Sequence, residues 1–248
     1  KNERPAAAPR ITAPTSASVF PVSAVALAVA LFAASPQARA ANECTPDPSA
    51  ANTVNCGAAS YPGGITYTVG TALTLNLNNP AMVIEGTGLS VTQPNGLGTP
   101  LHVIVNATNF GSITPTGTGT AILVSNTRAD GLTAFVMDGG SVVSNSASSA
   151  VLVSSSSRGD AQITLNAGQI ENNGSGSGIT ATVQTGLANG NATLVINGGT
   201  VRAALNAAHA QIFGPLGSGS TSVSIAGGSL LSTGGNGVWA ETRGKGTA

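Results

Sequence analysis

Two aspartates lie one repeat apart in the chain and could act as a pair of carboxylates. They are Asp130 and Asp160. If residues about 30 apart lie on successive strands, these carboxyl groups come near the separation of about 5 Å that retaining glycosidases use for an acid and a nucleophile. Such enzymes gather further acids with His or Arg on one face, and only Asp138 and Glu171 are close by here. We therefore expect no enzyme activity in this chain and name no catalytic residue.

A second candidate is the triplet Arg158-Gly159-Asp160, an integrin-type attachment sequence. Arg128-Ala129-Asp130 stands at the same place one repeat earlier, and Arg243-Gly244 occurs in the last copy. This recurrence favours a structural role in the turns, in which Arg and Asp neutralise each other from copy to copy. Exposed pairs of this kind contribute about 0–1 kcal/mol each to stability. Cell attachment through the triplet is the less favoured interpretation.

The remaining chemistry-bearing residues are two cysteines and two histidines. Cys44 and Cys56 lie close together in a polar stretch, and in an oxidising compartment they predict a disulfide that stabilises by about 3 kcal/mol. Two free thiols are the alternative. Neither a second Cys pair nor a nearby His accompanies them, and His102 and His209 each lack a partner at ligand spacing. We therefore predict no metal and no cofactor, and a solvated or hydrogen-bonded role for each histidine.

These residues are placed by a pattern that recurs about every 30 residues and is clearest from Asp130 onward. Each copy carries a pair of small residues, and the second of each pair gives the anchors Gly111, Gly140, Gly168, Gly199 and Gly228. Apolar residues alternate on both sides of the anchor, which indicates strands with one face in a core. Two positions after the anchors stand Ile113, Val142, Ile170, Val201 and Leu230.

A third apolar run follows in each copy. The runs are 122–124, 151–153, 179–183, 210–213 and 238–240. Each copy is thus predicted to be three short strands joined by bends of Gly, Ser and Asn. Such a unit cannot bury its inner face alone and must stack on its neighbours. Helical repeats have similar periods, but Gly, Ser, Thr and Val fill these segments in place of helix formers.

The predicted fold class is therefore all-β, a three-sided parallel β-helix with coils of about 30 residues. Equivalent residues of successive coils would lie about 4.8 Å apart. Glycine suits the sharp corners, because it accepts backbone angles that other residues resist. Asp138, Asn166 and Asn197 precede the corner glycines and are predicted either to form a ladder between coils or to act as solvated bend residues.

The composition excludes some partners. The formal net charge is zero and only 7% of residues are charged. A surface that binds nucleic acid or acidic lipid by electrostatics would need a basic excess. We therefore predict no nucleic-acid partner.

Residues 1–40 predict a secretory signal peptide with an extended positive region. Basic residues precede an almost wholly apolar stretch at 19–34, and small residues then offer a cleavage site between Ala40 and Ala41. A membrane anchor is the alternative, but the stretch is shorter than the roughly 20 residues that span a bilayer.

We expect residues 41–63 to be an N-terminal cap with the Cys pair, and 64–248 to be coils, regular from about 101. The last copy stops after its third strand, which predicts that the natural chain continues.

With its export signal, early Cys pair and coils with Gly-Gly-Ser/Thr-Val/Leu corners, the chain resembles the N-terminal part of a type V autotransporter passenger domain of the pertactin-like β-helix family. The resemblance implies a right-handed β-helix that a C-terminal outer-membrane β-barrel translocator, absent from this chain, carries to the bacterial surface or releases. It also implies an adhesin or stalk that contacts host-cell or matrix protein or glycan.

Two other functions stay open. The first is a passenger scaffold for a polysaccharide-acting enzyme or a protease whose catalytic part lies outside this chain. Arg243-Gly244-Lys245 matches the Arg-x-Lys segment of pectin hydrolases, but their acidic pair and His-Gly segments are missing. The second is a structural filament protein exported by a two-partner pathway.

Overall fold

The computed structural model describes residues 44, 52–94, 102–127, 130–156, 158–184 and 189–248. The signal peptide, its cleavage site at Ala40 and Ala41, and the earlier turn residues Arg128 and Ala129 lie outside the described residues. The secondary structure assigned in the described part is β-strand. The strands are β1 Thr53–Cys56, β2 Ser60–Tyr61, β3 Ile65–Thr68, β4 Leu73–Ile84, β5 Leu89–Gln93, β6 Val103–Ile113, β7 Ile122–Asn126, β8 Leu132–Met137, β9 Ser141–Ser144, β10 Ser149–Ser156, β11 Asp160–Leu165, β12 Gln169–Asn172, β13 Ser177–Gln184, β14 Ala192–Ile196, β15 Thr200–Ala203, β16 Ala208–Ile212, β17 Thr221–Ile225, β18 Ser229–Ser232 and β19 Val238–Thr242.

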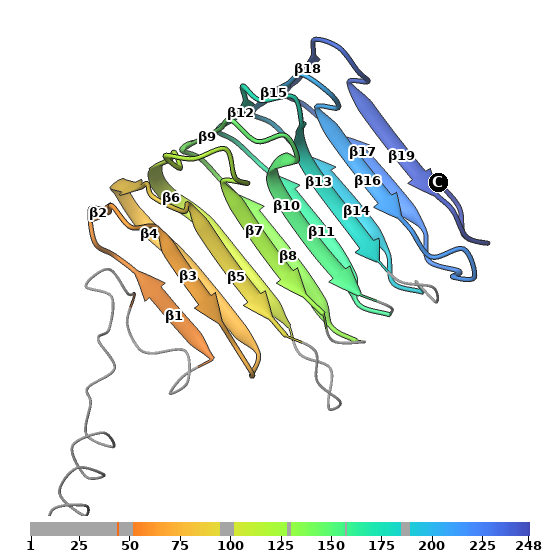
Figure 1. The fold of residues 1–248 in the computed structure, drawn as a ribbon, viewed down its shortest axis with the longest axis horizontal. Coiled ribbons are helices and arrows are strands. Elements are labelled where there is room, and N and C mark those ends of the chain that lie inside the picture. Colours follow the sequence, from red (N-terminus) through yellow and green to blue (C-terminus); the bar gives the residue numbers. More distant parts are fainter. Residues whose placement is uncertain (1–43, 45–51, 95–101, 128–129, 157, 185–188) are drawn as a thin grey trace, which may run out of the picture. The chain divides into compact units, whose positions relative to one another are not determined.

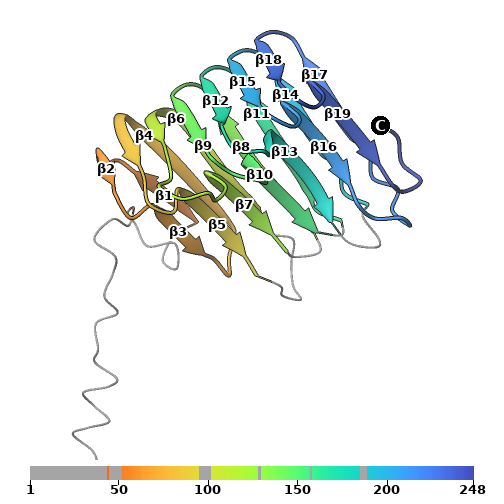
Figure 2. The same ribbon diagram turned by 45° about the horizontal axis from the view of Figure 1, so that its top comes forward.

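The strands form a three-sided solenoid of parallel strands, as predicted (Figure 1). A 12-stranded sheet covers two sides, because β6 pairs with β8 near its start and with β9 near its end. We call these the first face (β1, β4, β6, β8, β11, β14, β17) and the second face (β2, β9, β12, β15, β18 and the ends of β4 and β6). The 7-stranded sheet is the third face, with the order β19-β16-β13-β10-β7-β5-β3. Figure 2 shows the same strands stacked coil upon coil.

The predicted apolar column is confirmed. Backbone register joins Ile113 to Val142, Val142 to Ile170, Ile170 to Val201 and Val201 to Leu230. The first four of these side chains are 0–1% exposed and Leu230 is partly buried against the core. Burial of such residues is the main favourable term in folding, so the column holds successive coils together.

One predicted strand was displaced. The apolar run at 210–213 indicated a strand that includes Phe213, but β16 is Ala208–Ile212 and pairs Ala208 with Ile179. Phe213 is instead 39% exposed. The first two inner positions of this strand are Ala208 and Ala210, so the large apolar residues that mark other coils do not mark its start.

Four of the five anchors turn a corner with backbone angles that favour glycine. Gly140, Gly168, Gly199 and Gly228 have φ between 77° and 99°. Around Gly140 a Cβ would also lie 2.5 Å from the carbonyl oxygen of Phe110 in the coil below. Gly111 differs, because it lies inside the continuous strand β6 and is not among the positive-φ glycines. There, a Cβ would meet the carbonyl oxygen of Met82 at 2.6 Å, so close packing explains the glycine.

The first coil begins earlier than the sequence indicated. The cap predicted over 41–63 stays a prediction for its residues outside the described part, and in its described part β1 and β2 pair with β4. Both strands are short. Paired residues of β1 and β4 are also fewer positions apart in the sequence than paired residues of the regular coils, so the repeat could not be recognised here. Two coils therefore precede the five that carry an anchor.

The start of this coil is covered by Cys44, which forms a disulfide with Cys56 at a Cα–Cα distance of 4.5 Å. The Cys44 amide donates to the Tyr67 hydroxyl at 2.8 Å, and the Ala58 amide donates to the Tyr61 hydroxyl at 3.2 Å. Both tyrosine rings are buried inside the coil. The disulfide and these hydroxyl contacts thus close the N-terminal end of the core.

The predicted ladder at the first corner is present. The Asn166 side-chain amide donates to Asp138 at 2.6 Å, and the Asn197 amide donates to Asn166 at 2.7 Å. A second ladder, which the sequence analysis missed, joins Asn55, Asn76 and Asn106 on the first face, with bonds of 2.9 Å. Each amide both donates and accepts, so a column of them can continue through several coils.

We expect Asn166→Ala to lower the free energy of unfolding by about 1 kcal/mol, because it removes two exposed hydrogen bonds that contribute about 0.5 kcal/mol each. Asn197→Ala removes one of the two and should cost about half as much. Urea unfolding followed by circular dichroism measures both. Equal losses, or none at either position, would show that the ladder residues act only as solvated bends.

Candidate functional site

The acid pair considered first does not form a site. Register places Asp160 opposite Leu132, two positions along from Asp130, so the two carboxylates do not share a column. Asp160 accepts hydrogen bonds from the backbone amide of Asn191 at 2.8 Å and from its side-chain amide at 3.2 Å. The Asp160 carboxylate therefore links two coils.

The neighbouring acids also bridge coils. Asp138 belongs to the ladder described above, and Glu171 pairs with Arg202 of the next coil at 3.3 Å. Among the described residues there is no group of three or more His, Cys, Asp or Glu that could hold a metal ion. The acids and bases of this part of the chain are thus spread along the solenoid.

The attachment triplet spans the turn before β11 and the first residue of that strand, Asp160. Arg158 and Asp160 are exposed, while Gly159 is buried. Gly159 packs closely on the neighbouring coil, since a Cβ there would come within 2.8 Å of the carbonyl oxygen of Gly131. Among the described residues, the Asp160 carboxylate accepts its hydrogen bonds from Asn191. The expected neutralisation of Asp by Arg along the coils stays a prediction, because Arg128 lies outside the described residues.

The two histidines differ. His102 Nδ1 accepts a hydrogen bond from the backbone amide of Leu132 at 3.0 Å, which confirms a hydrogen-bonded structural role. His209 lies on the outer side of β16, and its buried Nε2 has no hydrogen-bond partner within the described part of the chain. His209 also lines a hollow that the sequence analysis missed.

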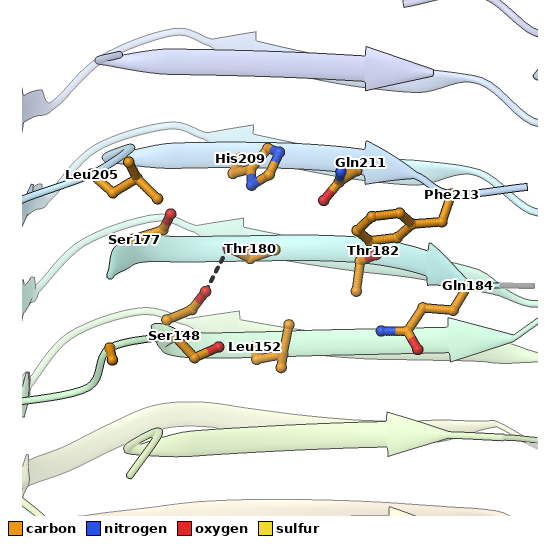
Figure 3. A pocket seen from close by; sticks show the side chains of 12 residues that line it. Ser148, Leu152, Ser177, Thr180, Thr182, Gln184, Leu205, His209, Gln211 and Phe213 are labelled. Atoms are coloured by element: carbon orange, nitrogen blue, oxygen red, sulfur yellow. Dashed lines mark hydrogen bonds between the residues drawn. The ribbon is translucent and has the colours of Figure 1, made fainter. Parts of the chain in front are cut away.

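This hollow lies on the outer side of the third face, over β10, β13 and β16, and has a volume of about 270 Å³ (Figure 3). Its floor is formed by Thr180 and Thr182 of β13. They are only 7% and 3% exposed although they point outward from the core. Larger side chains on the flanking strands surround them: Leu152 on β10, and His209 and Gln211 on β16.

Polar groups line the floor. The Thr180 and Ser149 hydroxyl oxygens lie 2.7 Å apart and share a hydrogen bond, drawn as the dashed line in Figure 3. The buried Thr182 hydroxyl has no partner among the described residues, and neither has His209 Nε2. Buried polar groups in proteins are almost always hydrogen-bonded, so these two atoms have hydrogen-bonding capacity left for a water or a ligand group.

The hollow opens beside a row of side chains on the last two coils. His209 is in register with Trp239, and their ring centroids are 6.0 Å apart. Gln211 donates to Glu241 at 3.0 Å. Trp239 lies on the outer side of β19, the last strand of the third face, and is 42% exposed. We call Trp239 and the hollow together the third-face site.

Arg243 ends this row. Its guanidinium lies 5.1 Å from the centre of the Phe213 ring, and its Nε donates to Glu241 at 2.7 Å. Arg243 is therefore engaged with its own neighbours, and Lys245 follows in a turn where its amide binds the carbonyl oxygen of Gly217. The Arg-Gly-Lys segment thus stands beside one carboxylate, that of Glu241, without a converging acidic pair.

Burial lowers the pKa of His209 below its usual value of 6.5, and the nearby Glu241 carboxylate opposes this by raising it. A histidine with a depressed pKa binds its proton more readily in the unfolded chain. We therefore expect full stability above about pH 6.5 and a decline as the pH falls from there through the folded-state pKa. Thermal unfolding between about pH 7.5 and 5 measures this dependence.

His209→Gln should remove that part of the pH dependence. The quantity to compare is the change in melting temperature with pH in the two proteins. Parallel curves would show that His209 does not carry the effect.

The third-face site could have been found from one sequence signal. Positions 209, 211 and 213 correspond to 239, 241 and 243 one repeat later. Besides His209, four of these six positions carry aromatic or ionisable side chains.

Comparisons with protein-family models, with curated proteins and with solved structures found no match. Within the described residues no helix is long and apolar enough to span a membrane.

Proposed function

We propose that the chain is an exported bacterial β-helical passenger, an adhesin or stalk that contacts protein or glycan on a host cell or matrix. The observation that carries this proposal is the third-face site. It combines a hollow, two buried polar atoms that have no partner among the described residues, and a tryptophan on the outer side of β19. Binding sites are concave, with aromatic or apolar walls and a few placed polar groups.

Two further features support export and a binding role. The disulfide between Cys44 and Cys56 suits an oxidising compartment outside the cytoplasm. Three acidic side chains form contacts between coils and do not converge on a common point: Asp138, Asp160 and Glu171. This arrangement favours a binding role over a catalytic one. A stacked solenoid also presents a long, regular surface of the kind that repeat proteins use for contact.

Attachment of the fluorescently labelled chain to cultured epithelial cells and to immobilised matrix proteins tests the proposal. We expect saturable binding that Trp239→Ala weakens and Arg158→Ala leaves unchanged. Both residues are exposed, so neither substitution should affect folding, and equal melting temperatures check this. A loss with Arg158→Ala alone would move attachment to the triplet. Absence of saturable binding to every surface would refute the proposal.

A further inference from the structure

We infer that the third-face site binds a neutral saccharide, with one sugar unit in the hollow over β13 and the adjoining unit against Trp239. This inference rests on the proposed function and names the class of ligand. Four features of the described residues carry it: the uncharged lining, the two unpartnered buried atoms, the exposed aromatic side chain and the paired backbone of the strands beneath.

The lining of the hollow contains hydroxyl and amide groups and no Asp, Glu, Lys or Arg. The hydroxyls belong to Ser148, Ser149, Ser177, Thr180 and Thr182, and the amides to Gln184 and Gln211. The charges beside the hollow, Glu241 and Arg243, pair with each other at 2.7 Å, so a charged ligand would lose its hydration here without gaining an unpaired counter-charge, which is costly. A sugar has many hydroxyls and no net charge, and each hydroxyl both donates and accepts a hydrogen bond.

The two unpartnered atoms fit such a ligand. The Thr182 hydroxyl can donate or accept, while an unprotonated His209 nitrogen that carries no hydrogen accepts. The Thr182 side chain is 97% buried by its neighbours, since it is 3% exposed. Separate hydroxyls of a sugar can pair with the two groups without any rearrangement of charge.

The aromatic side chain completes the site. Trp239 is 42% exposed and lies beside His209, with ring centroids 6.0 Å apart. A sugar ring has an apolar face of C–H groups, which packs on a flat aromatic side chain, and the indole N–H remains available as a donor. The hollow, at about 270 Å³, lies just below the range of about 300–1,000 Å³ for drug-sized ligands. It therefore suits one sugar unit, with the next unit reaching Trp239.

An extended peptide fits less well. Peptides that add to a sheet need an unpaired strand edge. β13 is paired on both sides, with β10 and with β16, so its backbone has no free edge at the hollow. A peptide would therefore find no backbone groups of the sheet to pair with. Its own backbone amides would have only a few side chains of the outer face as hydrogen-bond partners.

Titration of the 248-residue chain with neutral oligosaccharides of glucose, galactose, mannose and N-acetylglucosamine tests the inference. Oligogalacturonate and a sialylated trisaccharide serve as charged comparisons. The chain has a single Trp, so its fluorescence reports on Trp239 alone, and isothermal titration calorimetry gives the affinity independently. We expect saturable binding of at least one neutral series and none of the charged ones.

Thr182→Val keeps the shape of the side chain and removes its hydroxyl, and we expect it to weaken binding at least tenfold. Thr193→Val is the matched control, because Thr193 lies on the outer side of β14 in the first face, away from the hollow. It should leave the affinity unchanged. Equal melting temperatures show that both variants fold, and Trp239→Ala measured by calorimetry gives a second variant at an exposed position.

Each outcome decides the inference. Binding of the charged sugars alone, unchanged affinity in Thr182→Val, or no binding of any neutral series would overturn it. If the chain still attaches to enzymatically deglycosylated cells, the proposed function stands and only the saccharide assignment fails. If neutral sugars bind but no cell or matrix surface does, the assignment stands and the adhesive function fails.

Discussion

Phe135→Ala should lower the free energy of unfolding by about 3–5 kcal/mol, the usual cost of truncating a buried aromatic side chain. Phe135 is fully buried on the first face and lies between Val105 of the coil before and Ile163 of the coil after. Its removal leaves a cavity in the middle of the solenoid, at the junction of two coil interfaces. Because each coil contacts only its neighbours, both interfaces weaken together.

Val136→Ala is the matched control for this experiment. Val136 is the next residue of β8, points to the opposite side of the sheet and is only partly buried. It should cost at most about 1 kcal/mol, the span of β-propensity measured in host proteins. Denaturant unfolding followed by circular dichroism compares the two variants. Similar losses in both would mean that Phe135 does not lie in the core as the structure places it.

The fold could be predicted from the sequence because its determinants are local and recur. One apolar column, with Ile170 at its centre, and one corner glycine per coil are enough to define three strands and a turn. The ladder residues Asn166 and Asn197 could be predicted for the same reason, since each precedes its corner glycine by a short fixed spacing. A repeated local signal adds up over the coils, whereas a single copy would have been ambiguous.

The candidate site could not be predicted in the same way, because it depends on small differences between coils. Asp130 and Asp160 looked like a stacked pair at a constant period of about 30, but this coil is shorter and brings Leu132 opposite Asp160. The hollow depends on side-chain size on the outer side of three strands, where two threonines lie among larger neighbours. The core pattern places no constraint on those outward positions.

Loss of the disulfide has the second largest expected effect. Replacing both Cys44 and Cys56 with alanine should cost about 3 kcal/mol on the chain-entropy estimate for a loop of this size. The loss should appear first as local opening of the N-terminal coil, because among the described strands β1 pairs with β4 alone. In a solenoid, an end coil can open without unfolding the remainder.

The aromatic residues make this opening measurable. The chain has two Tyr and one Trp. Both tyrosines, Tyr61 and Tyr67, are buried in the first coil, whereas Trp239 lies on β19 at the other end of the third face. Tyrosine near-ultraviolet circular dichroism should therefore be lost at lower denaturant concentration than Trp239 fluorescence changes. Reducing the native disulfide without any substitution should reproduce the effect. Reduction keeps both sulfur atoms, so it separates loss of the covalent bond from loss of the cysteine side chains. Coincident tyrosine and tryptophan transitions, at the same midpoint as in the oxidised chain, would show that the disulfide does not hold the first coil in place.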